Sequence, residues 1–169
     1  SLLRGAIFRQ VGARLKADEL KGIAETLAAT DPLTGMANRR TMIALVERLT
    51  EEKQPFWLGI VDLDGFKMIN DSFGHKTGDR LLVAISNALK HALRSGDTLA
   101  RWGGDEFIAL LPDLPDLDSA RQAAQKLVDV CAQPIVLDDN VFNVTFSLGF
   151  AIYPDDADNA ETLLSQADR

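Results

Sequence analysis

The stretch "LARWGGDEFIALL" at residues 99–111 decides the fold class. Apolar runs flank Gly103-Gly104, a pattern that predicts a β-hairpin with a type I′ turn, in which both central residues have positive φ. A hairpin in the middle of the chain excludes a purely parallel sheet, whose strands need long crossover connections. Asp105 and Glu106 follow the glycines directly. On this stretch alone, two charges that keep a turn solvated are a sufficient explanation for them.

Helical and strand-like patterns alternate around this hairpin. Helices are predicted at 38–52, 65–73, 78–94 and 119–133 and from about Ala160, and strands at 56–64 and, as a pair joined near Asp138–Asn140, within 134–154. The order β-α-α-β-β-α-β-β-α predicts an α+β fold. Its central, mainly antiparallel sheet is covered by helices in a split β-α-β layout.

The N-terminal segment has a different character. Apolar residues recur at helical spacing through residues 1–29, namely Leu3, Ile7, Val11, Leu15, Leu20, Ile23 and Leu27. Turn signals in "TDPLTGMANRR" end this pattern. We therefore expect a linker or signalling helix at 1–30 and one domain at 31–169. The helix either packs on its own domain or forms a dimerising stalk that carries a signal from an upstream sensor domain.

Composition narrows the function classes. The chain has 169 residues, of which 46% are hydrophobic, and a net charge of −7, which argues against a general nucleic-acid binder. A small phosphorylated ligand stays compatible, because a divalent metal reconciles acids with phosphates. No apolar run reaches the roughly 18–20 residues that span a bilayer, so we expect no direct membrane contact from this segment. The single cysteine, Cys131, is consistent with a reducing, cytoplasmic compartment.

A second acidic pair ends the predicted strand at 56–64. Asp62 and Asp64 in "VDLDGFK" precede a helix start, where acids can simply be caps. If this strand neighbours the hairpin, however, Asp62 converges with Asp105 and Glu106. Three carboxylates so close together need a cation, and oxygen ligands suit Mg²⁺. The amides of Phe66 and Lys67 at the next helix start, with the Lys67 charge, would receive phosphates.

Five motifs in this order resemble those of the GGDEF family, the diguanylate cyclases. They are "DPLTGMANRR", "DLDGFKMINDSFGHKTGD", "ARWGGDEF", "SLGFAIYP" and "LLSQAD", and they cover about residues 31–169. The resemblance implies a fold similar to nucleotidyl cyclases. It also implies Mg²⁺-dependent (or Mn²⁺-dependent) condensation of two GTP into cyclic di-GMP and two pyrophosphates. Each domain would hold one GTP, so a homodimer would bring two domains face to face.

The resemblance also assigns roles to residues. Asp105 and Glu106 would be catalytic, with Asp105 binding metal or helping to deprotonate the 3′-hydroxyl. The implied metal site consists of Asp62, Leu63, Asp105 and Glu106. The implied substrate contacts are Phe66, Lys67, Asn70, Asp79, Gly103 and Gly104. Asn70 and Asp79 would hydrogen-bond guanine, and helix capping is the alternative for both.

A further pair, Arg94 and Asp97 in "RSGD", matches the Arg-x-x-Asp inhibitory site of the family, where the product cyclic di-GMP binds. An arginine fork suits phosphate or the Hoogsteen edge of guanine. A helix end followed by a Ser-Gly turn explains the same four residues.

The family pattern continues beyond "QAD" with basic residues that contact the triphosphate, whereas this chain ends at Arg169. We therefore expect a C-terminally truncated domain that binds GTP more weakly than the longer protein. The alternative to an active cyclase is a catalytically silent GTP-binding module, for example beside a phosphodiesterase domain. A pure dimerisation module would leave the three acids unexplained. The intact Asp62, Asp105 and Glu106 favour activity.

Overall fold

The structure is a computed structural model that describes residues 16–24 and 28–168. Its elements after a helical stretch at 16–24 are α2 (Arg39–Glu51), β1 (Phe56–Asp64), α3 (Phe66–Phe73), α4 (His75–Ala92), β2 (Thr98–Arg101), β3 (Glu106–Pro112), α5 (Leu117–Cys131), β4 (Ile135–Leu137), β5 (Asn140–Phe142), β6 (Thr145–Tyr153), α6 (Ala160–Ser165) and the 3₁₀ helix η1 (Gln166–Asp168).

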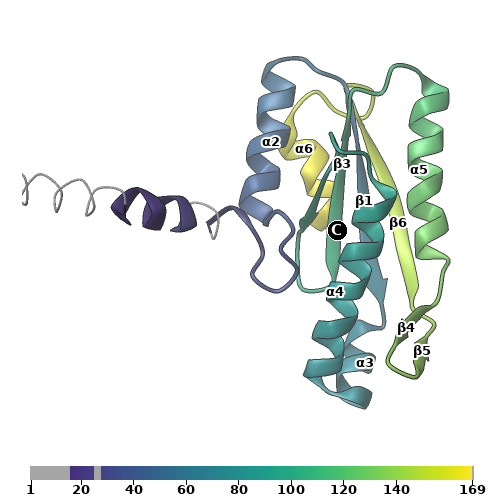
Figure 1. The fold of residues 1–169 in the computed structure, drawn as a ribbon. Helices are drawn as coiled ribbons and strands as arrows, with labels where there is room; N and C mark the ends of the chain where they lie inside the picture. The colour runs from purple at the N-terminus through teal and green to yellow at the C-terminus, as the bar shows by residue number, and fades with distance from the viewer. Residues whose placement is uncertain (1–15, 25–27, 169) are drawn as a thin grey trace, which may run out of the picture.

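The central sheet has the strand order β2-β3-β1-β6, and every neighbouring pair is antiparallel. Helices cover both of its faces (Figure 1), which confirms the predicted α+β class. Alternate residues of β3 divide between the two faces, as the pleat of a strand requires. Phe107 and Leu111 pack with α4 and α5, whereas Ile108 packs with α2 and α6.

Several predicted boundaries are confirmed. The strand at 56–64 is β1. Asn38 caps α2, because its Oδ1 accepts a hydrogen bond from the backbone N of Thr41 at 2.9 Å. The helix predicted at 78–94 is α4, which begins three residues earlier, at His75, and ends two residues earlier, at Ala92. Gly78 looked like a helix start but lies inside the helix.

The segment at 134–154 forms three strands where two were predicted. The turn near Asp138 is correct, and the positive φ of Asp138, 54°, closes it tightly. The second predicted strand is divided, however, into β5 and β6. β5 pairs only with β4 in a separate two-stranded sheet, and β6 joins the central sheet beside β1. No glycine or proline marks the break at residues 143–144, so the apolar pattern reads as continuous.

The turn of the β2–β3 hairpin is wider than predicted. The last ladder pair is Arg101 with Phe107, and the backbone N–H groups of Trp102 and Gly103 both donate to the Glu106 carbonyl, at 2.8 and 3.2 Å. The type I′ prediction was wrong, because neither Gly103 nor Gly104 has a positive φ. Three residues between Trp102 and Glu106 make the reversal without a pair of left-handed residues.

The helical stretch at 16–24 projects from the domain (Figure 1). Leu20 and Ile23 are 58% and 56% exposed, so the alternative in which they pack on the domain is not observed. Leu3, Ile7, Val11, Leu15 and Leu27 lie outside the described residues. No helix within the described ranges is long and apolar enough to cross a bilayer.

Candidate active site

The predicted convergence of acids is present at one end of the sheet. β1 and β3 are neighbours, and their register sets Asp62 opposite Glu106. The ladder continues into the turn, because the backbone N–H of Leu63 donates to the Asp105 carbonyl at 3.0 Å. Residues more than forty positions apart in the sequence therefore meet at one strand end. Asp105 and Glu106 are half-buried there, and Asp62 is exposed.

The acids influence one another electrostatically. Asp62 is exposed as a residue, but the partial desolvation of its carboxyl at the strand end raises its pKa, and the charges of Asp105 and Asp64 raise it further. A carboxyl surrounded by like charge favours its protonated form, and a cation would reverse that preference. Asp64 itself accepts a hydrogen bond from the Ser147 hydroxyl at 2.9 Å, which holds it at the edge of β6.

The donor set suits a hard divalent cation, because it consists of carboxylates with Leu63, whose apolar side chain leaves only its backbone carbonyl as a ligand. Among the residues that the structure describes, no group of three or more His, Cys, Asp or Glu side chains is arranged to hold a metal ion. The predicted ligands therefore share one strand end and the right chemistry. Their closure around a metal remains a prediction.

The hairpin turn is tied to the loop that follows the N-terminal helix. Arg101 donates to the Gly104 carbonyl at 2.9 Å and forms an ion pair with Asp31 at 3.4 Å, in which both side chains are less than one-fifth exposed. Asp31 also accepts from the backbone N and the hydroxyl of Thr34, at 2.9 and 2.8 Å. Burial alone would raise the pKa of Asp31, but the Thr34 and Arg101 interactions outweigh it and lower the pKa. Sequence reasoning missed this pair.

The predicted phosphate contacts stand at the start of α3. Phe66 and Lys67 are its first two residues, after Gly65 with a φ of 72°. No side chain caps this terminus, so the first-turn amides are not satisfied by a capping group. The left-handed conformation of Gly65 lets the chain turn sharply from the end of β1 into α3, so α3 begins four residues after Asp62.

Asn70 of α3 and Asp79 of α4, the predicted guanine contacts, lie on two helices that pack against each other. The side chain of Asn70 rests on the backbone of Gly78, where a Cβ would clash with Asn70 Oδ1. Gly78 directly precedes Asp79. Neither predicted residue is an N-cap, since Gly65 and Gly74 hold those positions, so helix capping does not explain them. Sequence reasoning missed this contact of Gly78, because the glycine looked like the start of the helix and lies inside it.

Arg94 and Asp97 form a closed pair. Nη2 of Arg94 lies 2.7 Å from Oδ1 of Asp97, and the backbone N of Arg94 donates to Oδ2 at 2.8 Å. The Asp97 side chain is 1% exposed, and its hydrogen bond raises the pKa of Arg94. The helix end and Ser-Gly turn that explain "RSGD" without a ligand are thus present.

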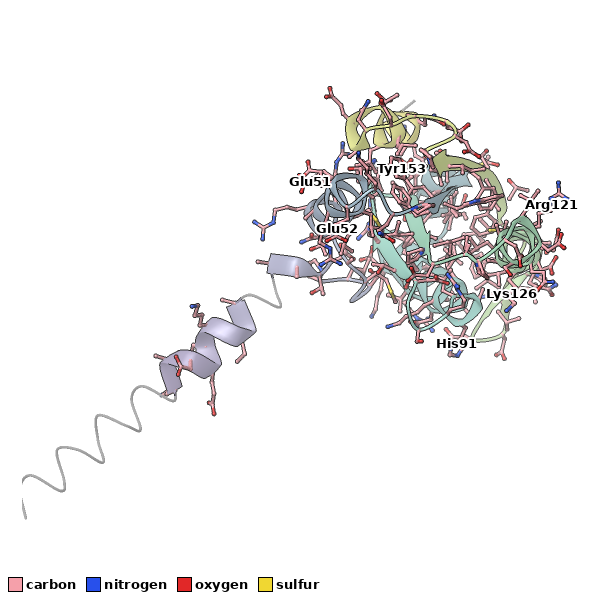
Figure 2. All side chains as sticks on the ribbon, turned by 90° about the horizontal axis from the view of Figure 1, so that it is seen from above. Glu51, Glu52, His91, Arg121, Lys126 and Tyr153 are labelled. Carbon is pink, nitrogen blue, oxygen red and sulfur yellow. The ribbon has the colours of Figure 1, made fainter. Side chains whose placement is uncertain are left out.

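Two cavities of about 310 and 300 Å³ share Arg94 and Asp97 in their linings. Lys90 lines the first cavity, and Lys126 of α5, labelled in Figure 2, lines the second. Sequence reasoning missed both lysines, because only the packing of α4 and α5 brings them to this pair. The surroundings therefore add positive charge and space for a polar ligand.

The comparisons with known proteins agree with this architecture. A family model described as "Diguanylate cyclase, GGDEF domain" matches residues 28–169. The chain is 37% identical over 148 residues to the response regulator PleD of Caulobacter vibrioides, covering 84% of this chain and 33% of PleD. It is 37% identical over 145 residues to the cyclic di-GMP phosphodiesterase NbdA of Pseudomonas aeruginosa, covering 83% of this chain and 18% of NbdA.

Among solved structures, the GGDEF domain of TpbB from Pseudomonas aeruginosa matches with a TM-score of 0.74 and 35% identity, covering 82% of this chain and 84% of that one. The chain spans a third or less of the two curated relatives. The predicted class of domain, a nucleotidyltransferase of the diguanylate cyclase type, is confirmed by these matches. The chain belongs to the GGDEF family of diguanylate cyclase domains.

Proposed function

We propose that the chain is an active catalytic domain that condenses two GTP into cyclic di-GMP and two pyrophosphates. The observation that carries the proposal is the β1–β3 register, which sets Asp62 opposite Glu106 and ties Asp105 to Leu63 beside the start of α3. An acidic strand end next to uncapped helix amides suits a metal-bound triphosphate. A solvated turn would need none of these partners.

Asp62, Asp105, Glu106 and the Leu63 carbonyl would hold Mg²⁺ or Mn²⁺. Such an ion lowers the pKa of a bound hydroxyl and neutralises charge on phosphate oxygens. The amides of Phe66 and Lys67 receive phosphate oxygens.

Asp105 accepts the proton of the 3′-hydroxyl. The 3′-oxygen then forms a bond to the α-phosphorus of the other GTP, and the bond from that phosphorus to pyrophosphate breaks. Two such steps close the ring, so two domains must face each other in a homodimer.

Asn70 and Asp79 give the site its base specificity. A carboxylate at Asp79 accepts from the N1–H and the 2-amino group of guanine together. Adenine lacks this pair of donors, and a site built to hydrogen-bond a missing group rejects its analogue strongly. The close approach of Asn70 to Gly78 supports this assignment, because Gly78 directly precedes Asp79 in α4.

The second candidate is a catalytically silent GTP-binding module. It is favoured by one observation, that the described acids are not arranged as a metal-holding group. The similarity to NbdA, which carries the name of a phosphodiesterase, is compatible with it.

Calorimetric titration of the chain with GTP and Mg²⁺, followed by mass spectrometry of the nucleotide products, separates the candidates. An active domain yields cyclic di-GMP, and Asp105→Asn keeps GTP binding while product falls at least about 100-fold, the usual size of a lost proton-transfer group. GTP binding without product supports the silent module. Absence of both contradicts the GTP site altogether.

For the Arg94–Asp97 pair we propose the binding of cyclic di-GMP as a product inhibitor. The two cavities that meet at this pair and their lysines support it. Charge-assisted hydrogen bonds are worth about 1.5–3 kcal/mol, so Arg94→Ala should weaken cyclic di-GMP binding by about tenfold to 100-fold. Arg121→Ala is the matched control, because Arg121 lies on α5 and lines neither cavity (Figure 2). Equal losses in both variants would contradict the assignment.

A further inference from the structure

The hairpin of β4 and β5 lies outside the central sheet and contacts both helices of the proposed guanine site. Arg80 of α4 donates two hydrogen bonds to Asp138 in the hairpin turn, Nη1 to Oδ2 at 2.7 Å and Nη2 to Oδ1 at 3.0 Å. The ring of Phe73, the last residue of α3, packs edge-on against Phe142, with centroids 5.1 Å apart and an interplanar angle of 75°. The β4–β5 hairpin thus contacts α3 through Phe142 and α4 through Asp138.

These two contacts lie on either side of the joint between the helices. Gly74 alone links Phe73 to His75, with a φ of 87° that suits glycine. α3 has no fully buried residue of its own. Partly buried Phe66 and Ile69 pack its first turn on the core, and the Asn70 side chain lies against Gly78. The contact of Phe73 with the hairpin adds a hold on its C-terminal end.

The hairpin also borders the space beside Asp79. Its residue Leu137 lines an open groove of about 410 Å³ together with Asp79, Arg80 and Lys76. The hairpin and the Asp79 carboxylate, which is proposed to bind guanine, therefore line the same groove. The hairpin contacts Phe73 at the end of α3 and Arg80 beside Asp79 in α4, so it bridges the two helices that carry the proposed guanine contacts.

We infer that the β4–β5 hairpin is a specificity-determining brace, in which Arg80 and Asp138 are positioning residues for the guanine contacts Asn70 and Asp79. The inference rests on the proposed function of this site in binding GTP. The Arg80 and Asp138 side chains are 48% and 68% exposed, so their ion pair adds little to folding stability. Its effect is expected in recognition, where two hydrogen bonds to guanine depend on angle and distance.

The test measures the affinity of the chain for GTP and for inosine triphosphate, both with Mg²⁺, by calorimetric titration. Arg80→Ala and Asp138→Ala should each weaken GTP binding by about twofold to fivefold, the range that an exposed ion pair supports. Inosine triphosphate lacks the 2-amino group, so its affinity should change less and the preference for GTP should narrow. The charge exchange Arg80→Asp with Asp138→Arg should restore GTP affinity.

The two single variants exclude a simple charge effect. Removing Arg80 takes away a cation and removing Asp138 takes away an anion, so long-range attraction of GTP would weaken in the first and strengthen in the second. Asp139→Ala is the matched control, because the Asp139 side chain is exposed in the same turn and forms no hydrogen bond or ion pair with the residues that the structure describes. Thermal unfolding checks that every variant is folded.

Opposite changes in the two single variants, or unchanged GTP affinity in both, would overturn the brace. An unchanged preference for GTP over inosine triphosphate would overturn it too, because guanine recognition would then be independent of the hairpin. If the unaltered chain binds no GTP, the proposed function itself fails and the brace with it. If the unaltered chain binds GTP and the hairpin variants bind it equally well, only the inference about the hairpin fails.

Discussion

At the scale of single residues, Gly78 shows how one missing side chain organises the site. It is buried within α4, and Asn70 occupies the space that its Cβ would fill. Glycine in a helix interior costs about 0.5–1 kcal/mol relative to alanine, so a structural reason for its presence is expected. The reason is that only a glycine at this position leaves room for the Asn70 side chain.

Gly78→Ala should therefore damage binding more than folding. The new methyl meets the end of a side chain, which can rotate away, so the unfolding free energy should fall by no more than about 1–3 kcal/mol. Asn70 loses its position, however, and GTP affinity should drop about twofold to tenfold, the value of one well-placed hydrogen bond. Urea unfolding and calorimetric titration give the two numbers.

Gly149→Ala is the control for this substitution, because a Cβ at Gly149 meets nothing within 4 Å. It should leave GTP affinity unchanged. A Gly78→Ala variant that binds GTP with normal affinity would show that the contact of Asn70 with Gly78 has no part in GTP recognition.

At the scale of elements, the ion pair between Arg101 and Asp31 joins the loop at 30–37 to the β2–β3 hairpin. The loop also adds backbone hydrogen bonds to β2, from Ala37 N to the Leu99 carbonyl at 3.1 Å and from Arg101 N to the Ala37 carbonyl at 2.9 Å. It thereby covers an edge strand that would otherwise expose unpaired backbone groups. The turn that carries Asp105 is thus anchored to the segment that follows the N-terminal helix.

Asp31→Asn should weaken this anchor in a pH-dependent way. The pKa of Asp31 is lowered in the folded state, so its contribution is fully present above the unfolded value and is lost as pH falls through the folded value. At pH 7 the variant should lose about 1.5–3 kcal/mol of unfolding free energy, as expected for a charged hydrogen bond. The difference in unfolding free energy between the variant and the unaltered chain should narrow below pH 3.8, the ordinary pKa of an aspartate.

Urea unfolding of both chains across pH 7 to pH 3 measures this gap. Asp158→Asn is a matched control at an exposed acid far from the hairpin in the sequence, and its gap should stay near zero. A constant difference for Asp31→Asn at all pH values would contradict the ionic nature of the contact.

The elements also show what the sequence can and cannot reveal. The meeting of Asp62 with Asp105 and Glu106 was predictable on the condition that the strand at 56–64 neighbours the hairpin, because each acidic motif stands where an apolar strand meets a loop. The structure meets that condition by pairing β1 with β3. The turn type was not, because local glycine statistics do not include the bond from Arg101 to Gly104. The Arg101–Asp31 pair joins residues 70 positions apart, and the Arg80–Asp138 pair joins residues 58 apart. Tertiary packing alone creates such contacts.

At the scale of the whole molecule, charge limits how two domains can face each other. The chain carries a net charge of −7, and its proposed catalytic face ends in acids. Two such faces repel until cations and nucleotides fill them, so assembly and substrate binding should be coupled. Leu20 and Ile23 in the helical stretch at 16–24 are exposed. Apolar contacts between these residues in two copies of the chain would oppose that repulsion.

The central claim is that the strand end built from Asp62, Asp105 and Glu106 makes a cyclase. The most direct test is the amount of cyclic di-GMP formed from GTP and Mg²⁺ by the protein, measured by mass spectrometry for the unaltered sequence and for Asp105→Asn. The account predicts cyclic di-GMP from the unaltered protein and at least about 100-fold less from the variant. Equal product from both proteins, or none from the unaltered protein while it binds GTP, would contradict it.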